Sequence, residues 1–351
     1  MTKPEFKDLF LSLTEYTVPF GTEQTLESLL PPGFRKDPSG NYVYEIGTSD
    51  TMFTTHLDTY SQKREPVSQM QAEDDEYVIL TDGTTILGGD NKLGCTILIG
   101  LIKDRVPGTY FFFVGEEPIL SGGLWGSRAA LSRDPAYFRR FRRCVAFDRR
   151  QYGSIVSRQM ARTCASDEFV AALAKELKSK GNIDFDPNSC FGYYTDTATF
   201  MDVIPECTNI SAGGFGEHTL DEWVDLNYAY DVYLAARQIK WDSLPVRREI
   251  KDRFRKGQKT RGIKGFLGFG AEKRVKDLKQ AMSEIDDLLL TRDYHDGKSR
   301  RLTYSTWLKD LDVDIWVSNS RIYMDERMRS PLSIQDVVSR AKTLLGVEPG
   351  P

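Results

Sequence analysis

The chain has 351 residues, a formal net charge of -4 at pH 7 and 40% hydrophobic residues. No window approaches the ~20 apolar residues of a membrane span, and the first residues lack the apolar core of a secretory signal. We therefore expect a soluble, cytoplasmic protein without a membrane partner. The five cysteines are scattered and form no CxxC pair, which argues against a disulfide framework and a zinc ribbon.

Positive charge is concentrated in one segment. Residues 246–276 carry twelve Lys or Arg and three acids, and glycines interrupt the second half of this stretch, as in a linker. The stretch holds only three aromatic residues, too few for a stacking platform, so nucleic acid is disfavoured as a partner. We predict a first domain over residues 1–245, a basic glycine-containing linker over 246–274 and a small appendage over 275–351.

Along the chain, segments with strand and helix patterns alternate. Thr2 and Glu5 form the pattern of a capping box, and apolar residues at helical spacing follow them. This alternation predicts an α/β fold, with a central, mostly parallel mixed sheet sandwiched by helices. Helical spacing in the appendage, over 275–289 and 334–345, predicts that it is mainly helical. The other expected elements are strands at 41–46, 52–56, 77–80, 110–114, 144–147 and 155–156, and helices at 93–102, at 126–131, from Ser166 onward and at 225–240.

Carboxylates and histidines recur beside the predicted strands. Only three histidines occur, and two of them lie in acidic clusters, His56-Leu57-Asp58 and Glu217-His218. In α/β sheets, ligands gather at the carboxyl ends of strands. Two imidazoles with several strand-end carboxylates are typical of a two-metal hydrolase site. Four further candidate carboxylates lie between the two clusters in the sequence, and these are Asp90, Glu116, Glu117 and Asp148.

Each role in such a site has a candidate. Asp90 lies between a Gly-Gly bend and a helix start, where a carboxylate can bridge two ions. Asp58 points to the same side as His56 and can hold its tautomer. Of Glu116 and Glu117, one can bind an ion while the other acts as general base, because neighbouring residues point to different sides. Asp148 and His218 complete the two ligand shells.

In this order the motifs resemble those of the co-catalytic zinc exopeptidases, the superfamily of bacterial leucyl aminopeptidase, peptidase T and the glutamate carboxypeptidases. The matching motifs, within residues 18–240, are His56-x-Asp58, Gly89-Asp90-Asn91-Lys92-x-Gly94, Glu116-Glu117, Gly123-Leu124-Trp125-Gly126-Ser127, Asp148 and His218.

The resemblance implies a role for each of these residues. His56 and Asp148 would hold one ion, and Glu117 and His218 the other. Asp90 would bridge the ions and Glu116 would be the general base. Asp58, from its position beside His56 and not from the resemblance, is the second candidate catalytic residue. The resemblance also implies a cis peptide bond after Asp90. Only 69 residues separate Asp148 from His218, too few for the extra dimerisation domain of some branches, so the single-domain aminopeptidase branch is the nearest.

Two further residues are candidates for substrate binding. Asp196, within Tyr193-Tyr194-Thr195-Asp196-Thr197, could bind a substrate amino group or could serve only as a turn residue. Arg149 could clamp a substrate carboxylate or could neutralise neighbouring acids.

These patterns predict a di-metal hydrolase, with an aminopeptidase acting on short peptides as the main interpretation. Zinc is favoured as the metal, and cobalt or manganese fit similar ligands. An amidase or deacylase of N-acylated amino acids would use the same site, and a catalytically silent protein that binds partners through its C-terminal tail is a non-enzymatic alternative. Side-chain preference, biological substrate and formation of a homo-oligomer are left open.

Overall fold

The computed structural model describes residues 1–117, 123–159, 162–181, 183–186, 191–192, 195–250, 288–295, 299–306, 312–318 and 321–323, with Ser333 and Gln335. The chain divides into two compact units, Met1–Lys251 and Asp252–Pro351. The first unit contains every candidate site residue named above.

A six-stranded sheet forms the centre of the first unit, in the order β1-β2-β6-β3-β7-β11. Strands β6, β3, β7 and β11 run parallel to one another. At one edge, β2 pairs antiparallel with β6, and β1 pairs antiparallel with β2. The predicted mostly parallel mixed sheet is therefore confirmed. Its strands are β1 (Arg35–Lys36), β2 (Tyr42–Ile46), β3 (Thr51–His56), β6 (Gly108–Phe113), β7 (Arg143–Arg149) and β11 (Glu206–Ser211).

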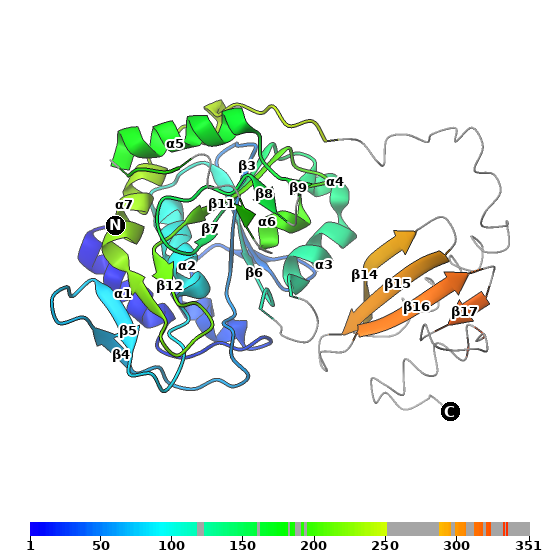
Figure 1. Cartoon of the computed structure of the whole chain (residues 1–351), viewed down its shortest axis with the longest axis horizontal. Helices are drawn as coiled ribbons and strands as arrows, with labels where there is room; N and C mark the ends of the chain where they lie inside the picture. The colour runs from blue at the N-terminus through cyan, green and yellow to red at the C-terminus, as the bar shows by residue number, and fades with distance from the viewer. Residues whose placement is uncertain are drawn as a thin grey trace. The chain divides into compact units, whose positions relative to one another are not determined.

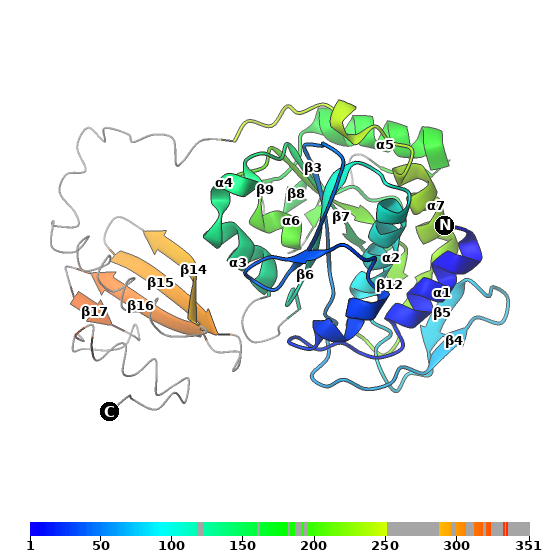
Figure 2. The same ribbon diagram turned by 180° about the vertical axis from the view of Figure 1, so that it is seen from behind.

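Helices cover both faces of this sheet (Figures 1 and 2). One face carries α1 (Lys3–Leu13), α2 (Gly89–Lys103), α5 (Asp167–Gly181) and α7 (Leu226–Ala236). The other carries α3 (Trp125–Arg133), α4 (Pro135–Phe138) and α6 (Asp196–Thr199). Two short 3₁₀ helices, η1 (Glu23–Leu29) and η2 (Trp241–Ser243), complete the described helical elements.

The apolar runs in the sequence become the core. All six residues of β3 and all six of β6 are buried, as expected for strands covered on both faces. Phe53 of β3 stacks on Tyr110 of β6 with ring centroids 5.0 Å apart. The Thr2 and Glu5 capping box at the start of α1 is present as predicted.

Two smaller sheets extend the first unit. The larger is antiparallel in the order β12-β13-β5-β4, and the smaller has the order β10-β8-β9. The four-stranded sheet places residues 216–222, which connect β12 to β13, next to the start of α2. The strands are β4 (Gln69–Gln71), β5 (Val78–Thr81), β8 (Arg158–Gln159), β9 (Arg162–Thr163), β10 (Phe191–Gly192), β12 (Gly214–Phe215) and β13 (Trp223–Asp225).

Two sequence predictions for this unit need correction. The strand expected at 155–156 is wrong, since Ile155 makes only an isolated bridge with Ile210. The strand β11 was not predicted, because its sequence Glu-Cys-Thr-Asn-Ile-Ser lacks an apolar run although all six residues are buried. Its polar side chains are accommodated by hydrogen bonds, such as that from Thr208 Oγ1 to the Val156 carbonyl at 2.7 Å.

The second unit contains an antiparallel sheet in the order β14-β15-β16-β17. Its strands are β14 (Leu288–His295), β15 (Ser299–Thr306), β16 (Asp312–Ser318) and β17 (Arg321–Tyr323). The expectation of a mainly helical appendage is therefore wrong for these residues, because apolar residues at alternate positions, such as Val313, Ile315 and Val317, follow the strand period. The predicted helices at 275–289 and 334–345 lie almost entirely outside the described residues, as does the predicted linker from residue 251 onward.

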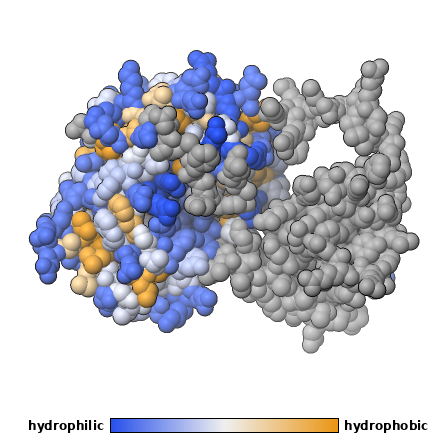
Figure 3. Space-filling model, in the orientation of Figure 1, coloured by the Kyte–Doolittle hydropathy of each residue, from blue (hydrophilic) through white to orange (hydrophobic). Residues whose placement is uncertain are grey.

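The visible exterior of the first unit is mainly hydrophilic, with separate small apolar patches (Figure 3). The exposed large apolar side chains among the described residues are Met70, Tyr152 and Leu220. No helix in the described part of the chain has the length and apolar character needed to cross a membrane.

The start of the predicted linker is attached to the first unit. The Glu206 carboxylate, fully buried at the start of β11, accepts hydrogen bonds from the Arg247 and Arg248 backbone amides at 2.7 and 3.0 Å. It also accepts from the backbone amide and hydroxyl of Ser166, just before α5, at 2.7 and 2.9 Å. The Arg248 guanidinium donates to the carbonyls of Met201 and Ile204. One buried carboxylate thus joins α5, β11 and residues 247–248.

We expect Glu206→Gln to lower the free energy of unfolding by about 1–3 kcal/mol, because the new amide group would face buried N–H donors in place of a carboxylate oxygen. Urea unfolding of the full chain measures this effect. Glu168→Gln, at an exposed glutamate in the first turn of α5, is the matched control and should change stability by less than about 0.5 kcal/mol. Equal stability of both variants would contradict the role assigned to Glu206.

Candidate metal centre

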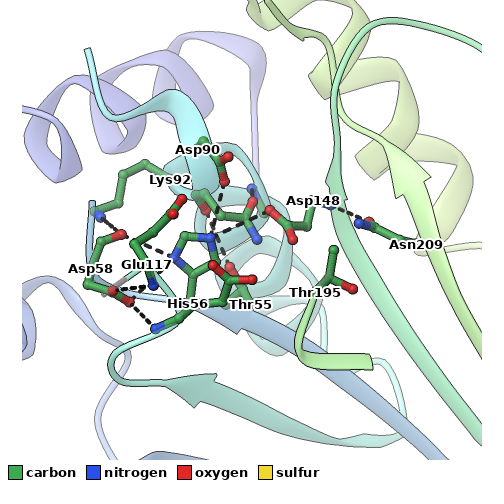
Figure 4. Close-up of polar contacts among 12 residues, drawn as sticks. Thr55, His56, Asp58, Asp90, Lys92, Glu117, Asp148, Thr195 and Asn209 are labelled. Carbon is green, nitrogen blue, oxygen red and sulfur yellow. Dashed lines mark hydrogen bonds and ion pairs between the residues drawn. The ribbon is translucent and has the colours of Figure 1, made fainter. Parts of the chain in front are cut away.

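The candidate residues meet at the carboxyl ends of three neighbouring strands. His56 is the last residue of β3, Glu116 and Glu117 follow β6, and Asp148 lies near the end of β7. Asp90 lies in the first turn of α2, over the same sheet edge. Figure 4 shows His56, Asp90, Glu117 and Asp148 pointing toward one another. The bond between Asp90 and Asn91 is a cis peptide, as the sequence resemblance implied.

Asp90 lies between two groups of potential ligands. His56 Nε2 is 3.1 Å from Asp90 Oδ1 and 3.6 Å from Asp148 Oδ1. On the other side, His218 Nε2 is 3.3 Å from Asp90 Oδ2 and 2.6 Å from Glu117 Oε1. Within each group the ligand atoms lie within 4.8 Å of one another. The two oxygens of Asp90 therefore face two different histidines, which is the geometry of a bridging carboxylate.

Glu116 lies beside both groups. One of its carboxylate oxygens, an oxygen of Glu117 and a nitrogen of His56 also lie within 4.8 Å of one another. Burial raises the pKa of Glu116 well above its usual range, and the nearby charges of Glu117, Asp196 and Asp148 act in the same direction, against the effect of His56. A carboxyl group in this state is suited to exchanging protons with a neighbouring molecule.

The charges of the site suit cations. Burial, and then the charge of Asp90, raise the pKa of Asp148 well above its usual range. Burial opposes the charged form of His56, yet hydrogen bonds to Asp148, Asp58 and Asp90 hold its pKa well above the ordinary value. Buried carboxylates at this density are costly unless positive charge compensates them. Oxygen and imidazole donors gathered around Asp90 fit divalent metal ions.

Asp58 orients several parts of the site. Its carboxylate is completely buried and accepts the backbone amides of Glu116 and Glu117 at 3.0 and 2.9 Å. The Oδ1 of Asp58 also lies 3.4 Å from His56 Nδ1. The same nitrogen is 3.1 Å from the backbone oxygen of Asp58. The predicted contact with His56 is therefore present. The hydrogen bonds from the backbone amides of Glu116 and Glu117 to Asp58 are not predicted by the sequence. Buried Lys92 donates to the backbone oxygens of Leu57 and Asp58 (Figure 4).

Sequence reasoning missed Glu222, which holds the backbone at Asp90. Its buried carboxylate accepts the backbone amides of Gly88 and Asp90 at 2.8 and 3.1 Å. Burial raises the pKa of Glu222 to about 7, against the effect of these hydrogen bonds. The one feature of the sequence that could have pointed to Glu222 is its position, four residues after the candidate ligand His218.

The two candidate substrate residues lie near the centre. Asp196 is buried at the start of α6, and its Oδ1 has no hydrogen-bond partner among the described residues. Burial, opposed by the charge of His56, raises the pKa of Asp196 to about 7. Arg149 lines a recess together with Asp90, Asp148, Arg150, Phe215 and Glu217. Residues 193–194 of the predicted substrate loop lie outside the described part of the chain.

Comparisons with known proteins support the fold. No protein-family model matches the sequence, and no curated protein matches it. Among solved structures, the chain is similar to aminopeptidase PepT from Bacillus cereus, with a TM-score of 0.55 and 14% identity over 68% of this chain and 97% of that one. A tripeptidase from Staphylococcus aureus gives a TM-score of 0.52 and 14% identity over the same shares of the two chains. The first unit thus shares the fold of these peptidases.

Close packing of α2 against β7 depends on Gly94. A Cβ added at Gly94 would lie 2.5 Å from the carbonyl oxygen of Phe147 and would also meet the Asn91 side chain. Phe147 immediately precedes Asp148 in β7. The missing side chain therefore allows the helix that begins at Asp90 to approach the strand that carries Asp148.

We expect Gly94→Ala to lower the free energy of unfolding by about 1–3 kcal/mol, because the backbone carbonyl of a central strand must shift to admit the methyl group. Thermal and urea unfolding measure the loss. Gly214→Ala is the control, since a Cβ there would make only an ordinary 3.4 Å contact with Leu93. If the two variants are equally stable, the close approach at Gly94 is not a constraint.

Proposed function

We propose that this chain is a metal-dependent exopeptidase, an aminopeptidase that hydrolyses short peptides with Glu116 as general base. The observation that carries the proposal is the position of Asp90 between two ligand groups, with one carboxylate oxygen facing each histidine. In this proposal, His56 and Asp148 hold one divalent ion, and Glu117 and His218 hold the other. Zinc is the favoured metal, with cobalt or manganese as substitutes.

Ions bound there would polarise the scissile carbonyl and make water more acidic. The residues of the chain then have separate tasks. Glu116 takes a proton from the attacking water and passes it to the leaving amine. Asp58 keeps Glu116 and Glu117 in place through their backbone amides. Its carboxylate also faces His56 Nδ1, which leaves Nε2 available for an ion.

The substrate is proposed to be a short peptide with a free amino group. Asp196, a buried carboxylate whose Oδ1 has no hydrogen-bond partner among the described residues, would bind that ammonium group. Arg149, in the recess beside Asp90 and Asp148, would bind a carboxylate farther along the peptide. The proposal places the enzyme in the cytoplasm, without a membrane partner, and leaves its oligomeric state open.

The proposal is tested with a library of short peptides that have free, N-acetylated or C-amidated ends, incubated with zinc-loaded full-length protein and analysed by mass spectrometry. We expect loss of N-terminal residues from free-amine peptides. Glu116→Gln should reduce this cleavage at least about 100-fold, because general-base catalysis is lost. Glu73→Gln, at an exposed glutamate, is the control and should retain wild-type cleavage.

Other outcomes would identify the alternatives. Cleavage confined to N-acetylated members would replace the aminopeptidase with a deacylase. Absence of Glu116-dependent turnover with zinc, cobalt and manganese would contradict an enzymatic function and direct attention to binding through the C-terminal tail, residues 246–351.

Metal binding should release protons. Burial disfavours the charged form of His218, but hydrogen bonds to Asp90 and Glu117 raise its pKa to about 11, and the pKa of His56 is also raised well above its ordinary value. These contacts favour the protonated form of both imidazoles in the ion-free protein, whereas ligation needs the neutral form.

We expect zinc binding to release protons at pH 7 and to become tighter as the pH rises from 6 to 8. Isothermal titration calorimetry in two buffers with different ionisation enthalpies measures the number of protons. An observed heat that does not depend on the buffer would show that the histidines are not protonated or do not bind the ion.

A further inference from the structure

The two histidines of the centre are held differently. The side chain of His56 is 2% exposed, and its Nδ1 lies 3.1 Å from the Asp58 backbone oxygen. His218 lies between β12 and β13, outside the central sheet, with a side chain that is 37% exposed and a backbone φ of 65°. Its Nε2 faces Glu117 and Asp90. Among the described residues, no hydrogen bond reaches its Nδ1.

An aromatic ring takes the place of that hydrogen bond. The imidazole of His218 stacks on the phenol ring of Tyr60, with centroids 4.4 Å apart and an angle of 12° between the planes. A parallel ring restricts both the tilt and the rotation of the imidazole, and these set the direction in which Nε2 points.

Tyr60 is itself held in place. The preceding residue, Thr59, is buried and is tied to Val18 twice: its backbone amide donates to the Val18 carbonyl at 2.8 Å, and its hydroxyl accepts from the Val18 amide at 2.8 Å. Tyr60 also follows Asp58 by only two residues. The backbone that carries the Tyr60 ring is therefore anchored just beyond the end of β3, the same strand that carries His56.

We propose that Tyr60 is a positioning residue for His218 and thereby sets the affinity for one of the two ions. This inference rests on the metal centre of the proposed function. Tyr60 aims the imidazole of His218 at the position that Glu117 and Asp90 share, and its hydroxyl group is not needed for this task. Partners that orient a metal-binding histidine typically contribute 10- to 100-fold to metal affinity.

The test compares Tyr60→Leu, which removes the ring, with Tyr60→Phe, which keeps it. Full-length ion-free protein is titrated with Zn²⁺ against a fluorescent chelator, so that two binding steps are resolved without any peptidase assay. We expect Tyr60→Leu to weaken one step about 10-fold or more and to leave the other unchanged. Tyr60→Phe should bind both ions as the wild type does. In a His218→Ala background, Tyr60→Leu should have no additional effect.

A second measurement tests the stack directly. With only three histidines in the chain, the imidazole signals can be assigned by NMR in the ion-free protein. The His218 ring protons should lose their ring-current shift in Tyr60→Leu and keep it in Tyr60→Phe. Circular dichroism and urea unfolding verify that both variants are folded.

The outcomes separate this inference from the proposed function. Two-step zinc binding that is unchanged in folded Tyr60→Leu, or equal loss in the Leu and Phe variants, would overturn the role of Tyr60 and leave the metal centre intact. A wild-type protein that binds zinc but cleaves no peptide would overturn the exopeptidase alone. A wild-type protein that binds no zinc would overturn both.

Discussion

The buried carboxylate of Asp58 connects the parts on which the candidate site depends. It lies beyond the end of β3 and accepts hydrogen bonds from two consecutive backbone amides in the segment after β6. It also faces Nδ1 of His56. Burial acts to raise the pKa of Asp58, but its hydrogen bonds to His56 and to the two amides lower it overall. A stable negative charge at this point therefore fixes both a histidine and the two glutamates. Because β3 and β6 are adjacent parallel strands, this single group sets the geometry across the sheet edge.

A second buried carboxylate performs the same task on the opposite side. The Glu222 carboxylate accepts hydrogen bonds from the backbone amides of Gly88 and Asp90. Glu222 also lies in the segment that carries His218. The bridging candidate and one histidine are thus tied to one another through the backbone. Asp148 is placed in a third way, since its own amide donates to the side chain of Asn209 in the neighbouring β11 at 2.8 Å (Figure 4). Rigid elements and buried hydrogen bonds thus fix these groups relative to one another, as a preorganised site requires.

The sequence predicted the features that short-range patterns encode. Apolar runs indicated β3, β6 and β7, and the residues after them brought the candidate ligands to one sheet edge. The strand β11 escaped prediction because Thr208 and Asn209 are buried through hydrogen bonds that only the folded chain provides. The role of Glu222 depends on a contact with residues more than 130 positions away, which no local pattern reveals. In the second unit, the helical spacing expected to extend to residue 289 overlaps a strand that begins at Leu288, because a short run of leucines satisfies either period.

The stacking of His218 on Tyr60 extends the same argument to the exposed side of the centre. His56 is enclosed by the sheet, so a buried carboxylate can hold it, and water does not weaken that contact. His218 is more than a third exposed, and a hydrogen bond there would compete with water. An aromatic contact is less affected by this competition, since it buries apolar surface instead of exchanging one polar partner for another. The different supports of the two histidines therefore follow from their different exposure, and both depend on the loop that leaves β3.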